Sequence, residues 1–473
     1  MPATFTAADL VAASRGALLQ GKGEDGFVGV STDSRTCQAG ELFVPLRGER
    51  HDGHAYIPKA LGRGVRGVVV EERAWRQNGL RSHLPPEVTA VAVADTLQAL
   101  GDLAQAWRRR FPIPVVSLTG SCGKTTAKEM IALILSRFYR ILKNDLNLNN
   151  LIGLPQTLLQ LDGTFEAAVV EMGMNRFGEI RRLTEISQPT VGVLLNVYPA
   201  HTEGVGCVEG VARAKGELIE ALPRNATLVY NADDTRVACQ AAGFPGRRLG
   251  FGFGPKANLR GISRQSRGPE GQVIEASWQG ASWPVHLGVP GEHQAMNALA
   301  AVAVALVLGL PPGEAARALA GFTAIHRRSQ VQDLPSGVHL LNDCYNANPG
   351  SMATALATLA ELKGAGQAAA ALGDMLELGG GAPEAHRELG RQAAVTGLDF
   401  LVICGSHRDD VAAGAKEAGL PATQIFPVAT KEEGARLLQD FLRPGDWLLV
   451  KGSRSMHMES LIDLLQKESQ GRT

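Results

Sequence analysis

A glycine-rich loop between an apolar strand and a helix constrains this chain more than any other feature of its sequence. The segment VVSLTGSCGKTTAKEM, residues 115–130, starts as a short apolar run and continues into a helical pattern. Glycines let the backbone turn tightly and direct its N–H groups at phosphate oxygens, and the following helix adds its dipole. We therefore predict an ATP-binding phosphate loop, in which the lysine neutralises phosphates and the next threonine coordinates Mg²⁺. Its residues are Thr119, Gly120, Ser121, Cys122, Gly123, Lys124, Thr125 and Thr126.

The loop is a variant, because Leu118 stands where the usual pattern has its first glycine. Strands and helices alternate after it, which predicts a mostly parallel sheet with helices on both faces. Residues 257–290 are polar, glycine-rich and alternating, which predicts hairpins added to that sheet. The predicted strands are 115–118, 167–170, 191–196 and 228–230, and the predicted helices are 127–138 and 208–222.

The length of 473 residues suggests about three domains. A helical pattern over 95–110 ends at Phe111-Pro112-Ile113-Pro114, because proline disfavours helix at itself and just before it. We predict an α/β protein with a small N-terminal domain (1–110), a central phosphate-loop domain (111–320) and a C-terminal Rossmann-like domain (321–473). In the last we expect strands at 338–341, 368–372, 400–403 and 447–450, and helices at 352–362, 384–394 and 431–441.

Composition excludes several classes of function. Lys plus Arg and Asp plus Glu both number 47, and this balance speaks against nucleic-acid binding. The most apolar stretch, 298–310, is shorter than the about 20 residues of a membrane span, so we expect a buried helix and no membrane insertion. The six cysteines are scattered, which favours reduced thiols and a cytoplasmic protein. We find no signal peptide, and we expect a monomer.

Several polar residues follow the loop. Glu171 ends the strand 167–170, where an acid beside the phosphate loop is well placed to hold a metal, although an exposed loop acid is an equally good interpretation. His201 follows the next strand and, taken alone, is a surface residue. Lys215 lies among glutamates on a helix, which is typical of a solvated face. His293 and Asn297 share one face at the start of an apolar helix, where polar residues are often caps.

Taken in order, these segments resemble the Mur ligase family of ATP-dependent amide ligases. TGSCGKTT is similar to the family's phosphate loop, and KNDLNLNNLIGLP (143–155) is similar to its asparagine-rich segment. VVEMGMN, NVYPAH, ARAKGEL and HQAMNALAA follow in the expected order and approximate spacing. The resemblance covers nearly the whole chain.

The resemblance implies roles that spacing alone does not. Thr125, Glu171 and His201 become Mg²⁺ ligands, and Lys215 matches a carbamylated lysine, whose carbamate is an anionic oxygen ligand. Asn297, Arg328 and Asp343 match positions that contact the nucleotide, the last two from the third domain. Arg328 is preferred because Ser-Gln follows it, and Arg327 stays open as the alternative. The implied catalytic residues are Lys124, His201, Lys215 and Arg328.

Further segments imply the substrates. Residues 31–57 resemble a nucleotide-sugar-binding domain, and NDCYNANPGSM, LGDMLELG and VKGSRSMHME resemble the third domain of members that use D-alanyl-D-alanine. A DNPR-type motif, which grips a diamino acid, is absent. The implied reaction joins D-alanyl-D-alanine to UDP-N-acetylmuramoyl-tripeptide through an acyl phosphate, in peptidoglycan precursor synthesis, with the third residue of the tripeptide left open. The candidate substrate residues are Ser31, Asp33, Ser34, Arg35, Arg47, His54, Asn149, Tyr345, Asn346 and Asn348.

The sequence also allows three other functions, each of which differs from this one in a testable way. Another ligase of the same architecture, such as a folylpolyglutamate-type enzyme, would not need the segment 31–57. A phosphate-loop kinase or regulatory ATPase would transfer or release phosphate without forming an amide. A nucleotide-binding module without activity would not need so many polar residues around one loop.

Overall fold

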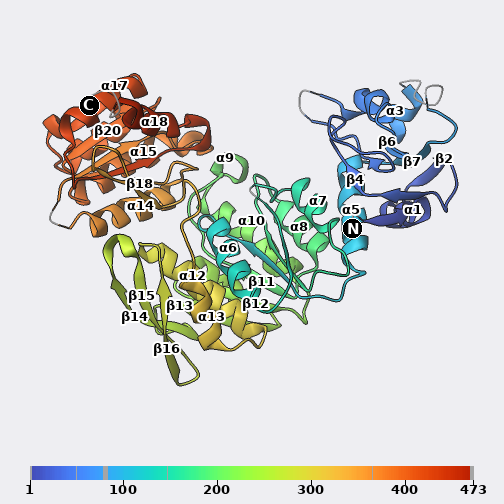
Figure 1. Ribbon diagram of the computed structural model, residues 1–473, viewed down its shortest axis with the longest axis horizontal. Coiled ribbons are helices and arrows are strands. Elements are labelled where there is room, and N and C mark those ends of the chain that lie inside the picture. Colours follow the sequence, from blue (N-terminus) through green and yellow to red (C-terminus); the bar gives the residue numbers. More distant parts are fainter. Residues whose placement is uncertain (1–2, 49–50, 78–83, 146, 365, 469–473) are drawn as a thin grey trace.

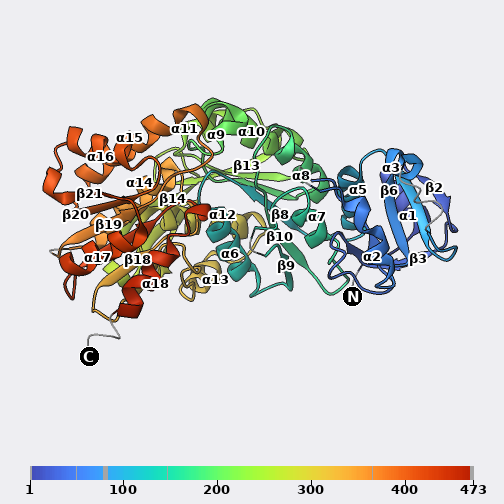
Figure 2. The same cartoon turned by 90° about the horizontal axis from the view of Figure 1, so that it is seen from above.

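The computed structural model describes residues 3–48, 51–77, 84–145, 147–364 and 366–468. Three α/β bodies follow one another along the chain, and the central body lies between the other two in both views (Figures 1 and 2). Each has its own main sheet, which confirms the predicted α/β class. Within the described residues, no helix combines the length and apolar character that a membrane span requires.

The N-terminal body has a five-stranded sheet in the order β2-β7-β6-β5-β4, in which only β2 is antiparallel to its neighbour. A separate antiparallel pair, β1 (Thr4–Thr6) and β3 (Gly26–Val28), lies beside it. The other strands are β2 (Ala17–Gln20), β4 (Val30–Ser31), β5 (Leu42–Phe43), β6 (Gly67–Glu71) and β7 (Thr89–Val93). The helices are α1 (Ala7–Ser14), η1 (Gly53–Tyr56), α2 (Ile57–Leu61), α3 (Glu72–Gln77) and α5 (Thr96–Arg108).

The central body has a nine-stranded sheet in the order β16-β15-β14-β13-β12-β11-β8-β10-β9. Its strands are parallel from β9 to β14, and β14, β15 and β16 form antiparallel hairpins. This confirms the predicted hairpins within 257–290. The strands are β8 (Val115–Thr119), β9 (Ile141–Lys143), β10 (Ala167–Glu171), β11 (Val191–Leu194), β12 (Thr227–Asn231), β13 (Arg247–Gly252), β14 (Leu259–Ser266), β15 (Gln272–Trp278) and β16 (Ala281–Leu287).

Helices cover this sheet on both faces. Most of the apolar stretch 298–310, predicted as a buried helix, lies in α12 (Glu292–Val307), and its last three residues follow the helix. Helix α12 packs against α6 (Lys124–Leu135) and β13 in the core. A helix that is apolar on all sides is stable only when it is enclosed in this way. The remaining helices are α7 (Gly153–Leu158), α8 (Glu179–Ser187), α9 (Thr202–Val205), α10 (Val208–Ala221), α11 (Thr235–Ala242), η2 (Gly268–Glu270) and α13 (Pro312–Leu319).

The third body has a six-stranded sheet in the order β17-β18-β22-β19-β20-β21, parallel except for the edge strand β17. All four predicted strands are present, and the sequence pattern missed β17, β21, α16 and α18. The strands are β17 (Gln330–Asp333), β18 (His339–Asn342), β19 (Ala368–Leu372), β20 (Phe400–Cys404), β21 (Ile425–Val428) and β22 (Trp447–Lys451). The helices are α14 (Pro349–Leu362), η3 (Gly379–Gly381), α15 (Ala382–Val395), α16 (Arg408–Glu417), η4 (Ala422–Gln424), α17 (Lys431–Phe441), η5 (Arg454–Met456) and α18 (Glu459–Glu468).

The carboxyl ends of the central strands lie side by side. Glu171 of β10 pairs with Leu118 of β8, and Leu194 of β11 pairs with Thr119 on the other side of β8. The phosphate loop, the segment after Glu171 and the segment after Leu194 therefore leave the sheet at one edge. Such an edge is where open α/β sheets bind ligands.

Candidate active site

A cavity of about 830 Å³ lies at this edge, between the central and third bodies. Both bodies contribute its walls, and the sequence predicted many of the residues concerned. The predicted residues that line it are Ser121, Cys122, Gly123, Lys124, Thr125, Thr126, Asn149, Glu171, His201, Asn297, Arg328, Asp343, Tyr345, Asn346 and Asn348. Thr119, Gly120, Lys215 and the candidates of the N-terminal body are not part of this lining.

The phosphate loop needs its glycines for two different reasons. Gly123 has a φ of +78°, and a Cβ placed there would come 2.5 Å from Oδ1 of Asn297. A Cβ on Gly120 would come 2.9 Å from Cβ of Leu195. The Lys124 ammonium donates to the carbonyl oxygen of Gly120 at 2.9 Å, so the lysine lies folded back along its own loop.

The segment after β11 holds the loop from one side. The Asn196 amide is bonded to Cys122 twice, accepting from its N–H at 2.9 Å and donating to its carbonyl at 3.1 Å. The Ser121 N–H donates to the Asn196 carbonyl at 3.1 Å, and the Ser121 hydroxyl bonds both backbone groups of Tyr198 at 2.9 Å. From the segment NVYPAH, the sequence predicted only the histidine as a site residue. It did not predict the contact of Asn196 with the loop, because the sequence around an asparagine does not show which residue it will bond.

Glu171 is buried and connects the loop to the asparagine-rich segment. One carboxylate oxygen accepts from the Thr125 hydroxyl and the other from the Asn149 amide, both at 2.8 Å. The Asn144 side chain bonds both backbone groups of Glu171, at 2.9 and 3.1 Å. The structure thus brings together the acid, the threonine and the asparagine that the sequence proposed separately. Residue 146 of that segment lies outside the described residues.

Lys215, on α10, is 1% exposed. Its side chain makes no hydrogen bond or ion pair with any residue that the structure describes. Burial, together with the charge of Lys124, holds the pKa of Lys215 well below its ordinary value. The helix-face interpretation of this lysine is therefore wrong, since the amine is enclosed and its neutral form is favoured.

His201 contacts the third body. Its Nδ1 lies 2.5 Å from Oε2 of Glu377, a residue in the loop between β19 and η3. The close contact with the His201 ring holds the pKa of the Glu377 carboxyl below its ordinary value. The contact lacks hydrogen-bond geometry, and Nδ1 of His201 is buried without a hydrogen-bond partner among the described residues. The Glu203 N–H donates to the Glu377 carbonyl at 3.2 Å, and the Thr202 hydroxyl donates to the Leu378 carbonyl at 3.1 Å.

The two adjacent arginines of the third body have different partners. Arg327 has a φ of +61° and forms an ion pair with Glu459 at 2.8 Å, outside the cavity lining. Arg328 lines the cavity, and its guanidinium lies 3.9 Å from the centre of the Tyr345 ring. Of the two arginines, Arg328 is the one whose side chain lines the cavity.

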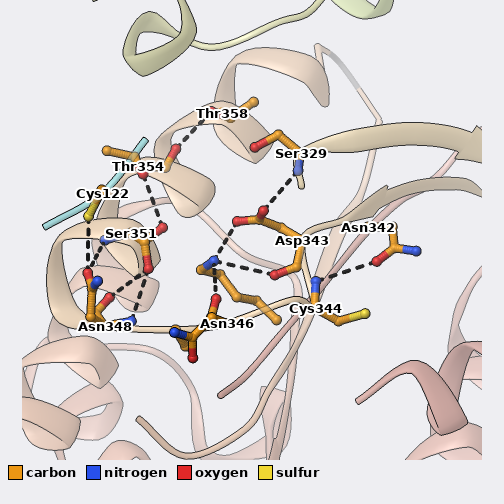
Figure 3. A network of polar contacts seen from close by, with 12 residues as sticks. Cys122, Ser329, Asn342, Asp343, Cys344, Asn346, Asn348, Ser351, Thr354 and Thr358 are labelled. Carbon is orange, nitrogen blue, oxygen red and sulfur yellow. Dashed lines mark hydrogen bonds and ion pairs between the residues drawn. The ribbon is translucent and has the colours of Figure 1, made fainter. Parts of the chain in front are cut away.

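Asp343 lies at the centre of a polar network (Figure 3). It accepts from the Ser329 N–H at 2.8 Å and forms a buried ion pair with Lys451 at 2.5 Å. Lys451 also donates to the Asn346 carbonyl at 2.9 Å, which fixes the loop that follows β18. Lys451, on β22, lines the cavity and was not among the predicted residues.

Asn348 links the third body to the phosphate loop (Figure 3). It caps α14 by accepting from the Ser351 N–H at 2.9 Å, and it also accepts from the Cys122 thiol at 3.2 Å. Its amide donates to the Ser121 carbonyl at 3.4 Å. Burial raises the pKa of the Cys122 thiol, so this thiol is kept protonated and donates.

His293 also lines the cavity, at the start of α12. Its Nε2 lies 3.2 Å from the Ser329 hydroxyl, whereas its Nδ1 is buried without a hydrogen-bond partner among the described residues. Burial lowers the pKa of His293 to about 4, so its ring is neutral at pH 7. A neutral imidazole with a free nitrogen offers a ligand one hydrogen bond without a charge.

The candidates of the N-terminal body begin with Ser31, the last residue of β4, and continue in the segments that follow β4 and β5. The Arg35 guanidinium, bonded to Asp33 at 2.7 Å, holds the pKa of that carboxyl at about 2. Arg47 contacts Asp52 and Glu71, at 3.1 and 2.9 Å. Ser31 is half-buried, Ser34 is buried, and residues 49 and 50 lie outside the described residues.

His54 is 1% exposed, and both its ring nitrogens are engaged. Its Nδ1 lies 2.6 Å from Asp52, and its Nε2 accepts from the Glu71 N–H at 3.0 Å. A substrate contact from this ring would have to replace one of these bonds. Thr32, in the same segment as Ser31 and Asp33, accepts from Gln156 of α7 at 2.7 Å, which ties this edge to the central body.

Comparisons with known proteins cover the same three bodies. Residues 27–108, 118–305 and 327–454 match families described as Mur ligase family catalytic domain, Mur ligase middle domain, and Mur ligase glutamate ligase domain. The UDP-N-acetylmuramoyl-tripeptide–D-alanyl-D-alanine ligase of Bacillus subtilis (strain 168) is 34% identical over 444 residues, which is 93% of each chain. The chain belongs to the Mur ligase family. It is thus an ATP-dependent ligase that forms ADP.

Solved structures of Mur ligases agree along the whole chain. MurF from Acinetobacter baumannii has a TM-score of 0.89 at 30% identity, over 99% of this chain and 100% of that one. MurF from Thermotoga maritima, solved in complex with ADP, has a TM-score of 0.81 at 27% identity, over 94% of this chain and 98% of that one. The three-domain architecture predicted from the sequence is confirmed.

Proposed function

We propose that this Mur ligase joins D-alanyl-D-alanine to UDP-N-acetylmuramoyl-tripeptide, with ATP converted to ADP and phosphate. The observation that carries the proposal is the single cavity in which the phosphate loop and Glu171 face Arg328 and Tyr345 of the third body. The full-length similarity to a ligase of that name supports the choice of substrates. The reaction belongs to peptidoglycan precursor synthesis, which implies a cytoplasmic enzyme.

In the proposed reaction, the tripeptide carboxylate attacks the γ-phosphorus and releases ADP, which converts a poor electrophile into an acyl phosphate. The amine of D-alanyl-D-alanine then attacks the acyl carbon, and the tetrahedral intermediate releases phosphate. Lys124 of the central body and Arg328 of the third body both line the cavity and offset negative charge, so that an anionic nucleophile can approach the phosphate. Because the third body supplies Arg328, a closed arrangement of the domains both completes the site and limits the access of water to the acyl phosphate.

The residues proposed to hold Mg²⁺ fit that ion. Thr125 and Glu171 present a hydroxyl and a carboxylate oxygen 2.8 Å apart in the cavity wall, and hard oxygen ligands suit Mg²⁺. Among the residues that the structure describes, no three His, Cys, Asp or Glu side chains form a metal cluster, so the proposed set draws on Thr125 and Lys215 as well. When bound, Mg²⁺ would neutralise phosphate charge.

Carbamylation of Lys215 fits its surroundings. The neutral amine attacks CO₂ and loses a proton, and the product is an anionic carbamate. Burial of Lys215 and its lowered pKa favour the neutral amine that this step requires. The carbamate would also explain why an amine that is buried, and has no partner among the described residues, lies near the phosphate loop.

Each body has a proposed task, with boundaries at residues 110 and 320. The first holds the uridine diphosphate end through Ser31, Asp33, Ser34, Arg35, Arg47 and His54. The second binds ATP, and the third receives the dipeptide around Tyr345, Asn346 and Asn348. We further propose that the enzyme acts as a monomer.

The test is phosphate release from ATP and UDP-tripeptide, measured with and without D-alanyl-D-alanine, with the amide product followed by mass spectrometry. Product formation that requires all three substrates is expected. Lys124→Ala should abolish both nucleotide binding and product formation. Phosphate release without an amide would favour an ATPase or kinase, and turnover without UDP-substrate affinity would favour a folylpolyglutamate-type ligase.

A further inference from the structure

Glu377 lies in a loop of the third body and contacts a residue at the central site. Its Oε2 is 2.5 Å from Nδ1 of His201, which leaves Nε2 as the ring nitrogen available to a ligand in the cavity. Histidines that ligate metals commonly donate their other ring N–H to a carboxylate, which fixes the tautomer and the ring orientation. The His201–Glu377 pair brings the same two groups into contact as a close ion pair, with the carboxylate supplied by another domain, although the ring N–H is not aligned on the carboxylate as in a hydrogen bond.

The two residues before Glu377 are held in place by hydrogen bonds within the third body. The Met375 N–H donates to Nε2 of His386, and the Leu376 N–H donates to the Ser453 hydroxyl, both at 2.9 Å. Glu377 itself has a φ of +64°, a conformation that residues other than glycine rarely adopt. Such strain persists where surrounding contacts impose it, and it turns this side chain toward the central body.

The segment of the central body that contains His201 is also held by hydrogen bonds, in this case to the Glu377 loop. His201 has a φ of +55°, and its neighbours Thr202 and Glu203 donate to the carbonyls of Leu378 and Glu377. These two hydrogen bonds to backbone carbonyls fix the His201 segment against the Glu377 loop. The His201–Glu377 side-chain pair lies beside them. The Glu377 side chain is 56% exposed and that of His201 is 24% exposed. An ion pair this exposed adds little stability, so orientation of the imidazole is the better explanation for the contact.

We propose that Glu377 is a positioning residue that orients His201 for metal binding only when the third domain is docked. This inference rests on the proposed function in one respect, the assignment of His201 as a Mg²⁺ ligand. It adds that docking delivers both Arg328 to the cavity and a carboxylate to His201. Docking would then complete the metal site and the phosphate site together.

The test measures metal binding and does not require ligation. Mn²⁺ is titrated by electron paramagnetic resonance into the full chain in the presence of β,γ-methylene ATP. We expect two bound Mn²⁺, one held by Thr125 and Glu171 and a second held by His201 and the proposed carbamate of Lys215. Glu377→Ala should weaken one of them about tenfold, the lower end of the usual effect of losing such a carboxylate. Glu377→Gln, which keeps an oxygen acceptor, should recover most of that affinity.

Two further variants separate positioning from simple domain contact. Glu361→Ala removes another ion pair between the same bodies, Arg264–Glu361 at 2.5 Å, and should leave both Mn²⁺ affinities unchanged. In a His201→Ala background, Glu377→Ala should have no additional effect. Equal losses from Glu361→Ala and Glu377→Ala, additive losses in the double variant, or a single Mn²⁺ in the wild type would each overturn the proposal.

Failure of this proposal and failure of the proposed function are distinguishable. If the wild type forms no amide product but Glu377→Ala weakens one Mn²⁺ as described, the reaction assignment falls and the positioning role stands. If the amide product forms but the Mn²⁺ affinities do not depend on Glu377, the positioning role falls and the reaction stands.

Discussion

One asparagine side chain holds the phosphate loop at two points. Because the Asn196 amide bonds both backbone groups of Cys122, Asn196→Ala removes two hydrogen bonds. At about 0.5–1.5 kcal/mol each, their loss predicts roughly 5- to 150-fold weaker binding of an ATP analogue, measured by calorimetry. Asn196→Asp keeps the acceptor and should lose less.

Asn258→Ala is the matched control for this prediction. Asn258 accepts from the Gly250 N–H at 2.8 Å in the same domain, but it does not line the cavity. Its loss should leave nucleotide affinity unchanged. Equal effects of the two substitutions would show that Asn196 acts on the stability of the domain and has no particular effect on the loop.

The buried lysine allows a chemical rescue. Lys215→Ala should be inactive, because the variant cannot form the proposed carbamate, and short carboxylic acids should restore part of the activity by placing a carboxylate in the space left by the side chain. Lys124→Ala, which removes a required positive charge, should gain nothing from the same acids. Full activity of Lys215→Ala without any acid would remove the carbamate from the mechanism.

At the scale of elements, α14 meets the central body in a tight contact. A Cβ on Gly350, the second residue of this helix, would come 2.4 Å from Cγ of Tyr198. Gly350→Ala should therefore displace the third domain and lower the ligation rate, although alanine favours helix by about 1 kcal/mol over glycine. Tyr198→Ala in the same chain should restore room and part of the rate.

The chain offers a closely matched control in α13. Gly313 also follows a proline at the start of a helix, and the nearest atom to a Cβ placed there is Nη1 of Arg317, at 3.5 Å. Gly313→Ala should keep full activity. A fully active Gly350→Ala variant would contradict the docked arrangement, and small-angle scattering of the variants would report the displacement directly.

Prediction from the sequence succeeded where one segment carries its own signal. The loop around Lys124 joins strand, glycines and helix in consecutive residues, and apolar runs such as 368–372 coincide with a strand. Helix α16, RDDVAAGAKE, was missed because its few apolar residues give a weak periodic pattern. Arg327 and Arg328 could not be separated, since the positive φ of Arg327 that turns the two side chains apart is a property of the folded chain.

Contacts between domains could not be predicted from the sequence. His201 and Glu377, or Cys122 and Asn348, lie far apart in the chain and meet only because loops of the central and third bodies come into contact. No periodic pattern encodes such a pairing. The motif LGDMLELG was useful only through its resemblance to a family, and its contact with the metal-site candidate required the folded structure.

At the scale of the whole molecule, α5 connects the first two bodies. It packs against α1 and also against α7 and α8. Trp107 is buried and donates to the Leu161 carbonyl at 2.9 Å, and the buried Arg108 donates to the Ser187 carbonyl at 3.1 Å. The proposed boundary at residue 110 therefore assigns to the first domain a helix that the central domain also uses.

Two truncations test this view of the boundary. Removal of residues 1–94 keeps α5, whereas removal of residues 1–108 also takes away Trp107 and Arg108. Loss of a buried tryptophan side chain alone costs about 3–5 kcal/mol, so the longer deletion should unfold at a clearly lower temperature. The shorter deletion uncovers the side of α5 that faces α1, and its melting temperature should lie between those of the longer deletion and the full chain.

The ligand affinities of the truncated chains test the tasks assigned to the first two domains. The shorter deletion should retain ADP affinity, because every residue of the cavity lining lies beyond residue 120, and it should lose affinity for the UDP substrate. Calorimetry with ADP and with UDP-N-acetylmuramoyl-tripeptide measures both. Equal stability of the two truncations would place α5 with the first domain alone, and unchanged affinity for the UDP substrate would refute the task assigned to that domain.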